Sequence, residues 1–161
     1  MTNDEMKKYA AALGFAAEKH FGQFRIGGLP YIIHPIAVSE AVTAKGYGFD
    51  YAVTALFHDL LEDTDATEEE ILSFGNERIL KAVKLLTKTR GYVMEEYVAG
   101  IKSDEIAFAV KSADRLHNLL SATCANDDFK RRYILESEIW YPDFDTEIPK
   151  AIKALKDSIK K

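Results

Sequence analysis

Residues 51–63, YAVTALFHDLLED, decide the fold class, because they join an apolar helical segment to an acidic end. Apolar residues cover almost every side of this segment as far as His58, and a helix that is apolar all round lies in the interior of a protein. Asp50 is well placed to cap its N-terminus. We therefore expect one central, buried helix, whose last turn carries charged groups that need a partner.

The segments on both sides of this helix also carry apolar residues at helical spacing, and strand-like alternation is scarce. Residues 21–35, FGQFRIGGLPYIIHP, hold three glycines and two prolines and are expected to form a loop. Asn3 is the expected cap of the first helix, and Thr67 with Glu70 forms a capping box. Further helices are expected at 3–21, 35–45, 67–74, 77–87, from 93 onward, at 104–121, and in two closing segments separated around 142–149. The sequence predicts an all-α, compact multi-helix bundle.

The composition is that of an ordinary globular protein, with 47% apolar and 29% charged residues. A length of 161 residues fits a single domain spanning 1–161. The formal net charge of −5 argues against a protein held to a nucleic-acid polymer or a membrane surface by bulk positive charge. No apolar stretch is long enough to cross a bilayer. The single cysteine, Cys124, excludes an intrachain disulfide; we expect a buried, inert thiol and a cytoplasmic protein.

Four polar residues end the central segment: His58, Asp59, Glu62 and Asp63. In a continuous helix His58 would share a side with Glu62, and Asp59 with Asp63, because residues four apart are neighbours. Burying such groups unpaired would cost several kcal/mol each. A divalent cation would supply the missing positive charge.

Two further residues are candidates for the same site. His34 lies at the start of the helix that Pro35 opens, and Asp114 lies midway along the helix expected at 104–121. Two imidazoles with two carboxylates suit Mn²⁺, Fe²⁺ or Zn²⁺ and leave coordination positions for water and a substrate oxygen. The residue types alone leave the choice among these metals open.

The order His34, His58-Asp59, Asp114 resembles the H…HD…D signature of the HD-domain metal-dependent phosphohydrolases. The surrounding sequence is closer still to the hydrolase domain of the RelA/SpoT alarmone enzymes and their stand-alone small hydrolases. The matching phrases are HFGQFRIGGLPYIIHP (20–35), ALFHDLLEDT (55–64), VKSADRLHNL (110–119) and, more loosely, RRYILESEIWYP (131–142). The resemblance thus spans residues 20 to about 142.

The resemblance implies an enzyme that uses one metal ion, usually Mn²⁺, to remove pyrophosphate from the 3′ position of guanosine tetra- or pentaphosphate (ppGpp, pppGpp). It implies that the metal ligands are His34, His58, Asp59 and Asp114, and that Glu62 and Asp63 are the catalytic acidic pair. Because the matching phrases belong to the hydrolase domain and no synthetase domain is recognisable, we expect an enzyme that degrades the alarmone and does not make it.

Three residues match substrate contacts of the family. Arg25 matches an arginine that packs against the base, Asn118 matches an asparagine that contacts the nucleotide, and Ser121 stands where threonine is common. His117 and Tyr31 are expected to pack or to support the site without binding the metal or the substrate.

The chain departs from the alarmone-hydrolase pattern at Ile26, Gly27, Leu29 and Leu120, where basic or polar residues are common. These departures leave a first alternative, an HD phosphohydrolase acting on another nucleotide or phosphoester. A second alternative is a regulator that binds a nucleotide without hydrolysing it. The intact acidic pair disfavours this alternative.

Overall fold

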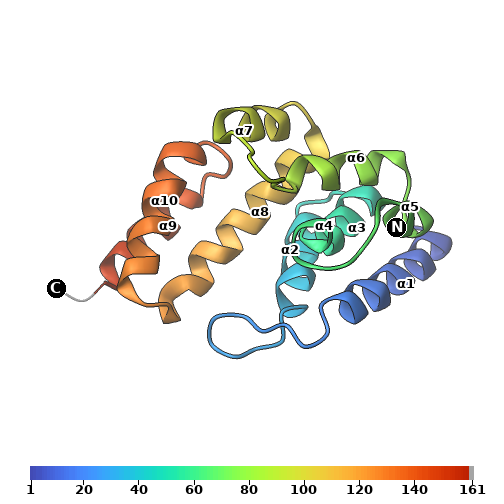
Figure 1. Ribbon diagram of the computed structural model, residues 1–161, viewed down its shortest axis with the longest axis horizontal. Helices are drawn as coiled ribbons and strands as arrows, with labels where there is room; N and C mark the ends of the chain where they lie inside the picture. The colour runs from blue at the N-terminus through green and yellow to red at the C-terminus, as the bar shows by residue number, and fades with distance from the viewer. Residues whose placement is uncertain (160–161) are drawn as a thin grey trace.

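The computed structural model describes residues 1–159, and these are helical over most of their length (Figure 1). The prediction of an all-α fold is confirmed. The helices are α1 (Asn3–Lys19), α2 (Ile33–Ala44), α3 (Phe49–Phe57), α4 (Leu60–Asp63), α5 (Glu68–Phe74), α6 (Glu77–Leu86), α7 (Met94–Lys102), α8 (Glu105–Ser121), the 3₁₀ turn η1 (Ala122–Cys124), α9 (Asp127–Trp140) and α10 (Ile148–Asp157).

Helix α8 runs through the middle of the molecule (Figure 1). Helices α1 to α6 lie on one side of it, α9 and α10 lie on the other, and α7 crosses near its N-terminal end. None of the helices in the described part of the chain combines the length and the apolar character that crossing a membrane requires.

Two hydrophobic clusters flank the central helices. One joins α1, α3, α5 and α6 around Phe15, Leu56 and Phe57, and the other joins α2, α7, α8 and α10 around Val110 and Ile148. Helix α3 contributes to both clusters, and its residues 52–57 are all fully buried. The prediction that this segment is central is therefore correct.

The prediction of one continuous helix over 51–63 is wrong. Helix α3 ends at Phe57 and α4 begins at Leu60, so His58 and Asp59 occupy a turn between them. Asp59 has φ −103° and ψ −3°, in the sparsely populated region between the helical and extended wells. The backbone amide of Asp63 still donates to the carbonyl of Asp59 (2.9 Å), so these two residues remain neighbours as predicted.

Two expected helix caps also differ from the structure. Thr2, not Asn3, caps α1, because its hydroxyl reaches the backbone amide of the third helical residue. Asp50 lies inside the first turn of α3, and its carboxylate accepts hydrogen bonds from Asn76 and Arg78 instead. Asp50 therefore joins α3 to the start of α6.

The loop between α1 and α2 is ordered by its own backbone hydrogen bonds. The amide of Arg25 donates to the carbonyl of Leu29 (2.8 Å), and the amide of Gly28 donates to the carbonyl of Arg25 (2.9 Å). Gly27 and Gly28 have φ of +102° and +86°, which side chains with a Cβ rarely adopt. This turn reaches η1, where the thiol of Cys124 contacts the carbonyl of Ile26. Cys124 is exposed, contrary to prediction, because η1 lies outside both clusters.

Candidate metal centre and substrate pocket

The structure brings together the four side chains proposed as metal ligands, although they come from α2, the α3–α4 turn and α8. The Nε2 atom of His34 lies 3.1 Å from Oδ1 of Asp114 and 3.8 Å from Oδ2 of Asp59. The Nε2 atom of His58 lies 3.0 Å from Oδ2 of Asp59 and 3.7 Å from Oδ1 of Asp114. The two Nε2 atoms are 3.3 Å apart. Two nitrogens and two carboxylates thus surround one point.

Both imidazoles are oriented through their other ring nitrogen. The Nδ1–H of His58 donates to the carbonyl of Ala55 (2.7 Å), which leaves the lone pair of its Nε2 facing the cluster. The Nδ1 of His34 lies 2.8 Å from Nδ1 of His117. Since Nε2 of His34 faces the carboxylates, we assign the proton to its Nδ1, so that His117 accepts. His117 therefore supports a proposed ligand, as expected.

The cluster requires a positive charge. Burial would lower the pKa of His58, but the carboxylates of Asp59 and Asp114 outweigh that effect and raise it to about 10. Burial lowers the pKa of His34. A divalent cation at the shared point would meet the same electrostatic demand while both imidazoles stay neutral, and the donor set of two nitrogens and two carboxylates fits such an ion.

Each aspartate has a further partner outside the cluster. Oδ2 of Asp114 accepts from the buried ammonium of Lys111 (2.9 Å), and its Oδ1 accepts from the amide of Asn118 (2.6 Å). Oδ2 of Asp59 accepts from the hydroxyl of Tyr31 (2.5 Å). Burial raises the pKa of this phenol well above its ordinary value, so Tyr31 stays a donor.

The contact of Tyr31 with Asp59 is a feature that the sequence analysis missed. Tyr31 does pack in the loop, since its ring lies 4.8 Å from that of His20, but its hydroxyl also reaches a proposed metal ligand. The sequence feature that could have identified this contact is the position of Tyr31 in the PYIIHP phrase, three residues before His34.

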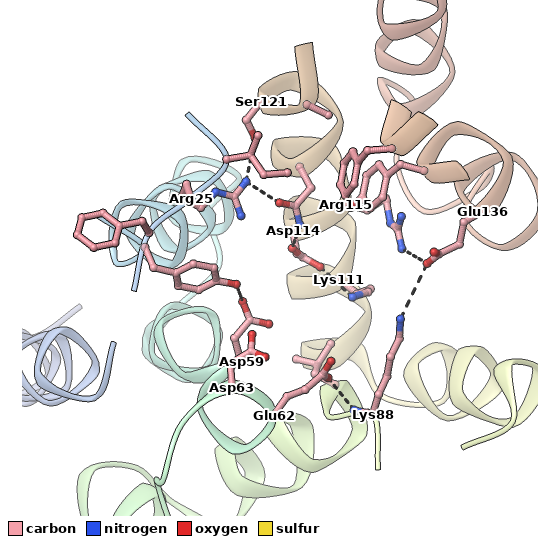
Figure 2. A pocket seen from close by; sticks show the side chains of 18 of the residues that line it. Arg25, Asp59, Glu62, Asp63, Lys88, Lys111, Asp114, Arg115, Ser121 and Glu136 are labelled. Carbon is pink, nitrogen blue, oxygen red and sulfur yellow. Dashed lines mark hydrogen bonds and ion pairs between the residues drawn. The ribbon is translucent and has the colours of Figure 1, made fainter. Parts of the chain in front are cut away.

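The acidic pair lies on α4, beside the cluster (Figure 2). Glu62 accepts the backbone N–H of Lys88 (2.8 Å), so its carboxylate points toward the segment that follows α6. Asp63 lies next to Asp59, and burial, followed by the charges of Asp59 and Glu62, raises its pKa. Both carboxylates line the pocket that the cluster faces.

That pocket has a volume of about 510 Å³, within the usual range for small-molecule sites. The three residues expected to contact substrate lie together on one side of it: the guanidinium of Arg25 donates to Oδ1 of Asn118 (2.7 Å) and to the hydroxyl of Ser121 (3.0 Å). Of the departures from the family pattern, Ile26, Leu29 and Leu120 are all exposed, and Ile26 also lines the pocket.

Opposite the acidic pair lie charged residues that the sequence analysis did not select. Arg115 donates to Glu136 (2.6 Å), and its guanidinium lies 4.3 Å and 4.0 Å from the ring centres of Tyr133 and Tyr141. The ammonium of Lys88 lies 4.0 Å from the same oxygen of Glu136 (Figure 2). Arg115 falls inside the ADRLHN phrase and Glu136 inside the looser phrase RRYILESEIWYP, but neither was assigned a role. Lys88 lies outside all of the matching phrases.

The comparisons with known proteins place this arrangement among alarmone hydrolases. A guanosine-3′,5′-bis(diphosphate) 3′-pyrophosphohydrolase of Borreliella burgdorferi is 35% identical over 126 residues, covering 71% of this chain and 19% of the relative. One of the same name from Aquifex aeolicus is 34% identical over 140 residues, covering 81% of this chain and 20% of the relative. The chain thus spans about one fifth of the length of these relatives. No family model matches the chain.

The fold has a counterpart among solved structures. A metazoan orthologue of SpoT, described as hydrolysing ppGpp, superposes with a TM-score of 0.75 at 21% identity, covering 93% of this chain and 94% of that one. The chain is therefore a homologue of the SpoT-type guanosine-3′,5′-bis(diphosphate) 3′-pyrophosphohydrolases, similar in sequence to about one fifth of their length and built on the helical HD fold.

Proposed function

We propose that this chain hydrolyses the 3′-pyrophosphate of ppGpp or pppGpp, releasing pyrophosphate and leaving a 3′ hydroxyl. The observation that carries the proposal is the convergence of two imidazoles and two aspartates beside an acidic pair in one pocket. The homology to enzymes of this name supports the choice of substrate.

His34, His58, Asp59 and Asp114 would hold one divalent cation, with Mn²⁺ the first choice and Fe²⁺ or Zn²⁺ the alternatives. When bound, such a cation supplies positive charge for the phosphoryl oxygens and eases the deprotonation of water. The hydrogen bonds from Tyr31 to Asp59, and between the Nδ1 atoms of His34 and His117, would hold these ligands in orientation.

Glu62 and Asp63 would orient the attacking water and accept its proton. Asp63 is suited to the proton transfer, because its raised pKa makes it a stronger base than an ordinary aspartate. Glu62 is suited to orientation, because the amide of Lys88 fixes one of its oxygens. A carboxylate at each of these positions is needed for the proposed chemistry but not for holding the metal.

Arg25, Asn118 and Ser121 would contact the nucleoside. The guanidinium plane of Arg25 can stack on a purine while its hydrogen bonds to the other two side chains hold it in place. The side-chain amide of Asn118 also donates a hydrogen bond to Asp114. A nucleoside that contacts Asn118 would therefore be one hydrogen bond away from a proposed metal ligand.

The test is elemental analysis of the purified protein coupled to a product assay on ppGpp. We expect one bound divalent metal per chain, release of pyrophosphate with Mn²⁺ added, and loss of that release with a chelator. Metal binding without release of pyrophosphate from ppGpp would refute the proposed substrate.

Ile26, which lines the pocket, favours a second candidate, an HD phosphohydrolase acting on another nucleotide, because this apolar side chain stands where the alarmone enzymes commonly carry a basic one. Assays with deoxynucleoside monophosphates and with reduced dinucleotide phosphates separate the two. Faster turnover of either than of ppGpp would favour the second candidate.

A further inference from the structure

The charged residues of the pocket are sorted onto two sides (Figure 2). Asp59, Glu62 and Asp63 form one side, here called the acidic wall. Lys88 and Arg115, with Glu136 between them, form the other side, here called the cationic wall. The proposed reaction uses the acidic wall and leaves the cationic wall without a role.

The pocket as a whole is close to neutral. Four cationic and five acidic side chains line it, which leaves one net negative charge, and a divalent cation would change this to one net positive charge. The charges do not cancel locally, however, because the proposed metal ligands, Glu62 and Asp63 lie on one side, whereas Lys88 and Arg115 share the single carboxylate of Glu136 on the other. A ligand with phosphates at one position only would leave the cationic wall without a phosphate partner.

Three cations of this pocket form ion pairs, and the pair of Lys88 is the longest; the fourth cation, Arg25, is held by Asn118 and Ser121. Arg115 lies 2.6 Å from its carboxylate partner and Lys111 lies 2.9 Å from Asp114, whereas the ammonium of Lys88 lies 4.0 Å from Glu136. The side chain of Lys88 is 24% exposed and lines the pocket. An anion arriving there would gain a partner without breaking a short ion pair.

Lys88 is also held in place before any ligand binds. Its ammonium lies 5.3 Å and 5.5 Å from the ring centres of Tyr92 and Tyr97, and its backbone amide donates to Glu62. Cation–π contacts with two rings restrict the flexible side chain, which lowers the entropy cost of binding. The same residue thus touches both walls, through its backbone on one side and its ammonium on the other.

We propose that Lys88, supported by Arg115, binds the phosphates that are not hydrolysed, so that the pocket selects nucleotides phosphorylated at both the 3′ and the 5′ position. This inference rests on the proposed function, which puts the 3′-pyrophosphate at the metal side. The 5′-diphosphate would then extend to the cationic wall. Guanidinium and ammonium groups are the usual partners of phosphate in proteins.

The experiment compares two substrates, ppGpp and guanosine 3′-diphosphate with a free 5′ hydroxyl. In Lys88→Gln we expect KM for ppGpp to rise about tenfold, the scale of one lost charge-assisted hydrogen bond at a partly exposed site. We expect kcat to stay within about threefold and KM for the 5′-hydroxyl substrate to change by less than about threefold. Lys88→Arg should retain most of the affinity, and Lys150→Gln on α10 is the matched control for loss of one positive charge.

Equal losses on both substrates, or a fall in kcat alone, would overturn the inference, because they would mean that Lys88 acts through Glu62. An unchanged KM for ppGpp would also overturn it. If the wild-type protein releases no pyrophosphate from ppGpp, the proposed function fails by itself. The subsite is then tested by calorimetry with guanosine 3′,5′-bisphosphate and Mn²⁺, where binding that is absent, or equal in wild type and Lys88→Gln, counts against it.

Discussion

The two walls of the pocket hold their charges in different ways. On the acidic wall Asp59, Glu62 and Asp63 come from five consecutive residues, and the charge of Asp59 is balanced only by the histidine cluster beside it. On the cationic wall Lys88 and Arg115 come from distant segments and share one carboxylate, that of Glu136. The acidic wall therefore depends on an ion, whereas on the cationic wall Glu136 offsets only one of the two positive charges.

Helix α8 joins the histidine cluster to the cationic wall. Asp114 faces the histidine cluster, while its neighbour Arg115 turns between two tyrosine rings toward Glu136 (Figure 2). Lys111, one turn earlier, is the buried countercharge of Asp114. Substitutions along this helix and along the acidic wall should therefore separate effects on the metal from effects on the fold.

The largest effect is expected for the metal cluster. Asp59→Ala removes a carboxylate that faces both imidazoles, so metal binding should weaken by about a hundredfold or more, beyond the range of changes outside the coordination sphere, and turnover should become undetectable. Elemental analysis and the ppGpp assay measure both. Asp128→Ala, an exposed acid on α9, is the control.

Asp114→Ala should abolish metal binding as Asp59→Ala does, and it should also destabilise the fold. It leaves Lys111 buried without its carboxylate, which typically costs about 3–5 kcal/mol, whereas after Asp59→Ala the neighbouring His58 can become neutral by losing its proton. Urea unfolding of the two variants should show this difference. Equal stability of the two would contradict the assigned role of Lys111.

A smaller effect, confined to rate, is expected for the acidic pair. Glu62→Ala should keep the metal and lower kcat by about 10²- to 10⁴-fold, the usual contribution of a positioned acid or base. Metal content and kcat are measured on the same preparation. Full activity of the variant lacking both Glu62 and Asp63 carboxylates would refute their assignment.

The acidic wall could be predicted from sequence because its residues lie in a continuous phrase. The distant His34 and Asp114 were candidates from their positions on expected helices, and the resemblance to a family implied that they are ligands of the same metal. The capping box of Thr67 and Glu70 was also predictable and is confirmed, because it involves only four residues. What local sequence could not supply was the turn at His58 and Asp59. Asp59 there takes a backbone conformation that the helical apolar spacing does not predict.

The cationic wall could not be predicted for a different reason. Lys88 lies between α6 and α7 and Glu136 lies on α9, so their approach depends on how both elements pack against α8. Cys124 was misjudged for a similar reason: its burial depended on where η1 falls relative to the hydrophobic clusters. Single residues whose partners are distant in sequence carry no periodic or spacing signal.

A moderate effect is expected for the hydroxyl of Tyr31. Tyr31→Phe removes the hydrogen bond to Asp59 but keeps the ring, so Mn²⁺ affinity should fall about tenfold, as for other partners of metal ligands. Calorimetric titration with Mn²⁺ measures this without turnover. Tyr47→Phe, which is exposed and stacks on Tyr51, is the control. Unchanged affinity would show that Asp59 is held by other contacts.

The smallest effect is expected at Asp104, which caps α8, the helix that carries Asp114 and Arg115. Its carboxylate accepts from the amides of Ile106 and Ala107 and pairs with Lys81. Burial would raise the pKa of Asp104, but these amides and Lys81 outweigh it and lower the pKa. The stabilisation is therefore fully present above the ordinary carboxyl pKa of 3.8 and is lost as the pH falls through the lowered value in the folded protein.

Asp104→Ala should lower the free energy of unfolding by about 1 kcal/mol at pH 7, and this difference should shrink in acid. Urea unfolding at pH 7 and below pH 3.8 measures it. Asp104→Asn keeps a capping oxygen but loses the pair with Lys81, so it should cost less. Because α8 carries Asp114 and Arg115 together, a weakened cap should leave Mn²⁺ affinity and the contribution of Lys88 to KM unchanged while the protein is folded. A selective change in either would mean that Asp114 and Arg115 are not positioned together by one rigid helix.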